Sequence, residues 1–173
     1  MKTDVSHQIA VYLKRVNPQH SASVEVIAFA IRSLSNFIIT TIVSLVIAYF
    51  LRQTTAVLLA MISFAVLRSI TGGYHLKTSI GCVVATSLMV NLIPFIPVHQ
   101  YAFYGMTFLS MLLCGIFGAR NINHTTRIPE KYFPLLRVLS IMVISTNLIV
   151  QSNVVALSFF AQSLSLVQIG KRR

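Results

Sequence analysis

The stretch "SLSNFIITTIVSLVIAYFL", from Ser33 to Leu51, is nineteen residues long and carries no charged side chain. A helix needs about 20 mainly apolar residues to cross the hydrocarbon core of a membrane. We therefore expect a transmembrane helix over 33–51. It is the apolar part of a longer helix, predicted from near Ser23 to Leu51, whose first part carries Glu25 and Arg32.

Further apolar runs follow this one, over 55–67, 80–97, 101–119, 138–151 and 154–169. Charged residues make up 10 % of the 173 residues, whereas a soluble domain has about 25 %. The runs are continuous rather than alternating, which favours helices over barrel strands. The sequence predicts an all-α fold, a polytopic integral membrane helical bundle of about six transmembrane helices in one domain over 1–173.

An amphipathic helix is expected at the N-terminus, over 4–16. Apolar residues there share one helical face and are Val5, Ile9, Tyr12, Leu13 and Val16. Such a helix either lies in the membrane interface or packs on the cytoplasmic ends of the bundle. The first twenty residues lack the apolar core of a secretory signal peptide.

The positive charge of the chain, formally +11, is concentrated in the segments between apolar runs. Segments 1–32, 68–79, 120–137 and 170–173 hold four, two, four and three of the fourteen Lys and Arg residues, and Arg52 is the remaining one. Cytoplasmic loops are enriched in Lys and Arg. We therefore expect both termini, the segment 68–79 and a basic loop over 120–137 to be cytoplasmic. This explanation takes precedence over nucleic-acid binding.

The segment "RSITGGYHLKTSIGC", over 68–82, places several chemically active residues between two apolar runs. Gly72 and Gly73 are expected to break the helix. His75 and Cys82 are seven residues apart, or about 10 Å along an unbroken helix. The chain must therefore fold back within 76–79 if the two side chains are partners.

Cys82 is a candidate nucleophile. Ser79 is a good N-cap residue, and a helix starting after it puts the Cys82 thiol in the first turn, where the helix dipole and a nearby His75 favour a thiolate. Arg68 would add positive potential or hold a carboxylate. The less specific interpretation is that a lone cysteine packs in a helix interface, and we assign Cys114 to that class. Two cysteines without paired spacing indicate neither a disulfide framework nor a metal site.

At these residues the chain resembles the accessory gene regulator protein B family of membrane cysteine endopeptidases. Arg68, Gly72, Gly73, His75 and Cys82 carry the specific match. The resemblance implies a His75–Cys82 catalytic pair, a cell-membrane location and no cofactor. It also implies a substrate, the precursor of a quorum-sensing peptide, with an amphipathic leader, a central signal segment and an acidic C-terminal tail.

The implied reaction removes that tail through a thioester on Cys82, and an internal thiol or hydroxyl of the precursor then closes a thiolactone or lactone. Backbone amides near 80–82 are the expected oxyanion donors, and Asn91 is a candidate third group. The basic residues Arg120, Arg127, Lys131 and Arg137 either attract the acidic tail or only set topology. The alternative is a non-catalytic membrane protein, a small transporter or signalling subunit, with a polar Arg68, His75 and Glu25 cluster. The assembly stays open between a monomer and a homodimer.

Overall fold

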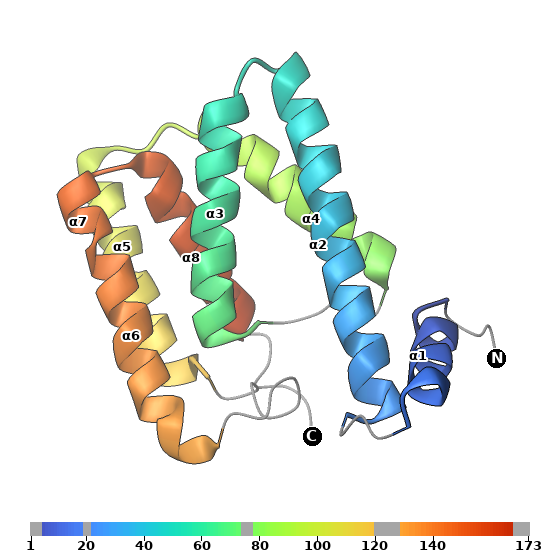
Figure 1. Cartoon of the computed structure of the whole chain (residues 1–173). Helices are drawn as coiled ribbons and strands as arrows, with labels where there is room; N and C mark the ends of the chain where they lie inside the picture. The colour runs from blue at the N-terminus through green and yellow to red at the C-terminus, as the bar shows by residue number, and fades with distance from the viewer. Residues whose placement is uncertain (1–4, 19–21, 74–77, 120–128, 168–173) are drawn as a thin grey trace.

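The computed structural model describes residues 5–18, 22–73, 78–119 and 129–167. These residues form helices and no strand (Figure 1). The α-helices are α1 (Val5–Val16), α2 (Val24–Phe50), α3 (Thr54–Thr71), α4 (Ser79–Leu92), α5 (Gln100–Phe117), α6 (Phe133–Ser145), α7 (Asn147–Val150) and α8 (Asn153–Val167), and two short 3-10 helices are η1 (Ile93–Phe95) and η3 (Glu130–Tyr132).

The length and apolar character of the helices confirm an all-helical membrane protein. Within the described residues, four stretches are long and apolar enough to cross a bilayer: α2, α3, α5 and Glu130–Val150. Two further apolar helical stretches, Ser79–Phe95 and Asn153–Val167, are shorter. The predicted number of about six spans therefore remains a prediction.

Helix α2 begins and ends close to where the sequence predicts. Ser23 caps its start, with the side-chain oxygen accepting from the Val26 amide, and Leu51 is the C-cap. The outward face of α2 is apolar and exposed, as Ile42 (58 %) and Phe50 (78 %) show. Side chains of this kind facing outward are expected where lipid surrounds the helix.

Two sets of helices pack together in the bundle. Helices α3, α5, α6 and α8 enclose a core that includes Leu67, Ile144 and Phe159, while α2 packs along α4. Small hydroxyl-bearing residues lie buried between the helices, among them Ser110, Ser140, Ser158 and Ser163. Small side chains of this type allow close helix packing in membranes.

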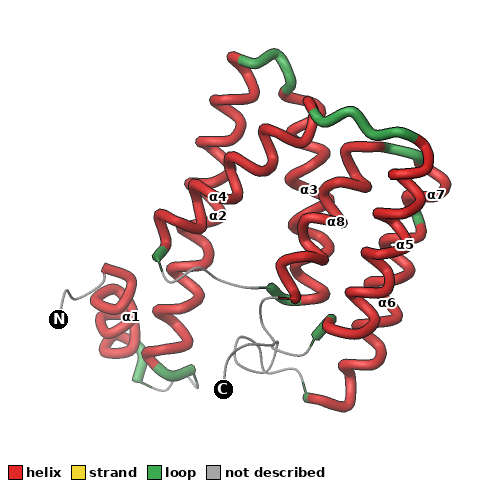
Figure 2. The backbone as a smooth tube through the Cα atoms, turned by 180° about the vertical axis from the view of Figure 1, so that it is seen from behind, coloured by secondary structure: helices red, strands yellow, loops and turns green. Residues whose placement is uncertain are grey.

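Helices α2 and α3 run in opposite directions, so the turn between them and the far end of α3 lie at opposite ends of the bundle. The α2–α3 turn, which contains Arg52, lies at the top of Figures 1 and 2, while the end of α3 and the start of α6 lie at the bottom. This arrangement separates Arg52 from Arg68 and Lys131, as the charge pattern predicts.

The predicted basic loop over 120–137 is partly wrong. Residues 130–132 form η3, and α6 begins at Phe133, so Arg137 lies on a helix. Pro134 belongs to the first turn of α6, where a missing backbone N–H costs nothing. Residues 120–128 lie outside the described part of the chain.

Helix α1 agrees with the predicted amphipathic segment 4–16 over residues 5–16. It packs against α2 and buries Ala10. Its apolar residues Val5, Tyr12 and Val16 stay about two-thirds exposed, at 67 %, 65 % and 65 %. The helix therefore contacts the bundle and also presents an exposed apolar face. Its place in the membrane interface stays a prediction.

Candidate active site

Arg68 lies in the last turn of α3. The apolar run was predicted to stop at residue 67, but the helix continues to Thr71, so Arg68 is a helical residue. Gly72 ends the helix with φ 73° and ψ −159°, a backbone conformation that is essentially restricted to glycine. The predicted helix break at the glycines is confirmed.

A buried glutamine of α8 fixes the point where the chain leaves α3. The Gln162 side-chain amide donates to the Gly72 carbonyl at 2.6 Å and to the Thr71 hydroxyl at 3.2 Å. The Ala119 amide donates to the Thr71 carbonyl at 3.1 Å. The start of the glycine segment is therefore held by residues distant in sequence.

Gly73 lies in close contact with Arg68. A Cβ atom at position 73 would lie 2.8 Å from Nη1 of Arg68 and 3.2 Å from Nε2 of Gln162. The Arg68 guanidinium also lies over the Phe64 ring, 5.7 Å from its centroid, within range of a cation–π interaction. The glycine thus leaves room for the arginine head group.

Cys82 lies in the first turn of α4, but the predicted cap is wrong by one residue. Thr78, not Ser79, is the N-cap: its backbone is extended and its hydroxyl accepts from the Gly81 amide at 3.2 Å. Ser79 is the first helical residue, so its own side chain does not cap. The Cys82 amide donates to the Thr78 carbonyl at 3.2 Å. Two of the amides predicted to hold an oxyanion are therefore already used.

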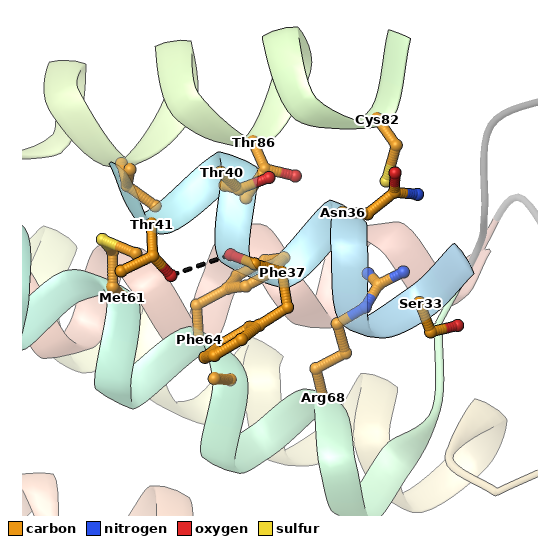
Figure 3. Close-up of a pocket in the computed structure, with 12 residues that line it drawn as sticks. Ser33, Asn36, Phe37, Thr40, Thr41, Met61, Phe64, Arg68, Cys82 and Thr86 are labelled. Atoms are coloured by element: carbon orange, nitrogen blue, oxygen red, sulfur yellow. Dashed lines mark hydrogen bonds between the residues drawn. The ribbon is translucent and has the colours of Figure 1, made fainter. Parts of the chain in front are cut away.

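A cavity of about 130 Å³ brings Cys82 and Arg68 together between α2, α3 and α4 (Figure 3). The Arg68 charge and Cys82 are close enough to interact electrostatically. Polar side chains lie beside them, and the rest of the wall is apolar. The lining residues are Ser33, Asn36, Phe37, Thr40, Thr41, Met61, Phe64, Ala65, Arg68, Cys82, Thr86 and Val90.

Several predicted site residues lie elsewhere. His75, Arg120 and Arg127 lie outside the described residues. Asn91 is on the same helix as Cys82 but nine residues further on, about 13 Å along the axis. It is buried and donates to the Ser87 carbonyl at 2.9 Å. Asn91 is therefore not a third group at the thiol.

Within the described part of the chain, the other charged residues that the sequence analysis singled out do not line the cavity of Cys82. Glu25 is exposed in the first turn of α2 and does not line the cavity with Arg68. Lys131 lies exposed in η3, and Arg137 donates from Nε to the Gly118 carbonyl at 3.0 Å, which joins α6 to the end of α5. The Arg68–Glu25 part of a polar cluster is therefore not formed.

Cys114 has the packing role that the sequence assigned to it. It is fully buried in the core beside Leu67 and Ile144, and its Sγ lies 3.3 Å from the Ser163 hydroxyl. It does not line the cavity that holds Cys82. Within this fold the two cysteines have different surroundings.

The sequence analysis overlooked the α2 side of the cavity. Ser33, Asn36 and Thr40 line it at positions i, i+3 and i+7, so they share one helical face. This polar stripe is present in the quoted stretch 33–51. Polar residues at helical spacing within an otherwise apolar span are the signal that would have predicted an internal polar face.

A comparison with family models decides what kind of protein this is. The model described as accessory gene regulator B matches residues 6–168, nearly the whole chain. The chain belongs to the AgrB family. The match covers the segment that contains Arg68, Gly72, Gly73, His75 and Cys82.

Comparison with curated proteins agrees with this membership. A Halalkalibacterium halodurans protein, named for its likeness to AgrB, is 25 % identical over 171 residues, which cover 96 % of this chain and 85 % of the relative. No solved structure matches the chain. AgrB family membership and the apolar helices identify a membrane protein and fit a role in processing autoinducing-peptide precursors.

Proposed function

We propose that this AgrB family member is a membrane-embedded cysteine endopeptidase that removes the C-terminal tail from a short quorum-sensing peptide precursor. One observation carries the proposal: Cys82, in the first turn of α4, and Arg68, in the last turn of α3, line the same cavity. Cysteine reactivity depends on the thiolate, and a first-turn position near a positive charge favours it. His75, seven residues before Cys82, is the base in this proposal.

The mechanism begins with proton transfer from the Cys82 thiol to His75. The sulfur attacks the carbonyl at the C-terminal edge of the signal segment, and the C–N bond then breaks. His75 returns the proton to the leaving amine. The tail departs with a free amino group, and the remainder of the precursor is a thioester on Cys82.

Ring closure follows by exchange of this thioester. An internal thiol or hydroxyl of the precursor gives its proton to His75 and attacks the thioester carbonyl. The bond from this carbonyl to the Cys82 sulfur breaks, and Cys82 leaves as a thiolate paired with the protonated His75. A thioester and a thiolactone have similar energies, so the step needs no ATP. A cavity whose wall is only partly polar limits water, which favours cyclisation over hydrolysis. The exposed Lys131 and the basic segment around Arg127 supply positive potential for an acidic tail.

The thioester gives a direct test. Purified protein mixed with a precursor peptide and quenched in acid should carry an added mass equal to the precursor without its tail. The adduct should map to Cys82, disappear with hydroxylamine, and form normally in Cys114→Ala. Cleavage during a single turnover with no adduct on Cys82 would contradict the mechanism. The precursor to use is a short peptide encoded beside the gene, with an amphipathic start, a central Cys or Ser and an acidic end.

The proposed orientation places the end of the bundle that contains Arg68 and Lys131 in the cytoplasm. Thirteen of the fourteen Lys and Arg residues belong to the segments expected on that side of the membrane, and cytoplasmic segments are enriched in these residues. Single cysteines introduced into a Cys82→Ala/Cys114→Ala chain can be labelled in intact cells with an impermeant maleimide. Cysteine at His99 or Ser152 should react, and cysteine at Thr78 should react only after permeabilisation. The reverse pattern would overturn the orientation.

A further inference from the structure

At the start of α4, two of the three backbone donors expected for the oxyanion of the proposed reaction are already engaged, and the Ile80 amide is the one that remains. In acyl transfer, the negative oxygen is stabilised by donors placed about 3 Å from it. The amide of Cys82 donates to the Thr78 carbonyl, and that of Gly81 donates to the Thr78 hydroxyl. With these amides engaged, a side chain of the cavity is the stronger candidate.

Asn36 of α2 meets the requirements for such a donor. It lines the cavity with Cys82, and the two side chains point toward one another across the contact between α2 and α4 (Figure 3). Among the described residues, the Asn36 amide has no hydrogen-bond partner. A half-buried amide without a partner in an apolar span is costly, so a role in the site would account for it.

The neighbouring polar groups are less suitable. Arg68 packs over Phe64 and against Gly73, and its charge already interacts electrostatically with Cys82. The Thr41 hydroxyl donates to the Phe37 carbonyl at 2.8 Å. Thr86 lies one helical turn beyond Cys82 along α4. Asn36 is thus a lining side chain that points toward the thiol and has no hydrogen-bond partner among the described residues.

We propose that Asn36 is a catalytic residue whose side-chain N–H stabilises the oxyanion formed at Cys82; this rests on the proposed peptidase function. When the Sγ–C bond forms, the π electrons of the carbonyl move to oxygen, and the Asn36 N–H donates to that oxygen. Collapse re-forms the carbonyl and breaks the C–N bond, and the leaving amine takes its proton from His75. Asn36 exchanges no proton in either step.

The test compares two reactions of the Cys82 thiol in a Cys114→Ala background, where Cys82 is the sole cysteine. p-Nitrophenyl acetate acylates the thiol through an oxyanion, whereas iodoacetamide alkylates it by direct displacement. In Asn36→Leu, acylation should slow by roughly tenfold or more, because one oxyanion donor is lost. Alkylation should stay within about twofold, since it depends on the thiolate rather than on that donor.

The matched control is Ser35→Ala, which changes the neighbouring exposed residue of α2 outside the cavity. It should leave both reactions unchanged. Asn36→Ala is the second variant, used if the leucine variant does not elute as a folded protein. Slowing of both reactions together would mean that Asn36 acts on the thiol, and slowing of neither would mean that it donates nothing. Either result overturns the proposal.

Precursor cleavage and the two thiol reactions together distinguish a failure of the Asn36 proposal from a failure of the peptidase mechanism. Cleavage of a precursor by Cys82→Ala would remove the peptidase mechanism, while the ratio of acylation to alkylation would still decide the role of Asn36. If the peptidase mechanism holds, kcat for precursor cleavage by Asn36→Leu should fall by about 10²–10³-fold.

Discussion

Cys82→Ala should lower the rate of precursor cleavage by roughly 10⁴-fold or more, because an enzyme that loses its nucleophile retains only binding and oxyanion stabilisation. The measurement is product formation by purified protein in nanodiscs, followed by mass spectrometry. Cys82→Ser should be nearly as inactive, since a serine hydroxyl is far less ionised than a thiol. A non-catalytic membrane protein would instead tolerate both substitutions.

Cys114→Ala is the internal control for this experiment. Cys114 is buried in the α3–α5–α6–α8 core and lies outside the cavity of Cys82, so cleavage should stay close to the wild-type rate. Removing its sulfur leaves a small void and should cost on the order of 1 kcal/mol of stability. An inactive Cys114→Ala beside an active Cys82→Ala would reverse the assignment of the two cysteines.

The elements that were predicted well depend on local sequence. Helix α2 runs from Val24 to Phe50, and its limits follow from a capping serine, an uncharged run and the turn at Arg52. The break after α3 follows from adjacent glycines. In each case the residues that determine the feature lie within a few positions of it, so the helix limit can be predicted from the local sequence.

The start of α4 shows where local patterns become ambiguous. Thr78 and Ser79 both have a hydroxyl that can cap a helix. Which of them does so depends on the backbone of the incoming chain, and Thr78 is the residue with the extended conformation, φ −117° and ψ 138°. The shift of one residue changes which amides are free near Cys82, and with it the source of the oxyanion donor.

The contacts that assemble the site could not be predicted because they join distant segments. Gln162 holds the Gly72 carbonyl from 90 residues away, and nothing beside Gln162 in the sequence indicates this bond. Asn36 reaches Cys82 only because α2 packs along α4. Periodicity predicts which face of a helix is polar, but it does not identify the helix that packs against that face.

Gly72→Ala should have a larger effect than alanine at Gly73 or Gly105. Gly72 has φ 73° and ψ −159°, and a residue with a Cβ in this region costs about 1–3 kcal/mol. Relief of that strain requires rotation of the backbone, which would break the 2.6 Å bond from Gln162 and redirect the chain three residues before His75. We expect a lower melting temperature in detergent and a fall in kcat/KM of roughly tenfold or more, as about 1.4 kcal/mol would give.

Two other glycines provide graded controls for this prediction. A Cβ at Gly105 on α5 would meet no atom within 4 Å, so Gly105→Ala should leave activity unchanged and should not lower the melting temperature, because alanine favours helix. Gly73→Ala should lie between the two, since its Cβ would approach the movable end of Arg68 at 2.8 Å. If Gly72→Ala melts and cleaves like Gly105→Ala, then the conformation at Gly72 and its bond to Gln162 do not position the segment that leads to His75, and the site must be ordered by contacts further along the chain.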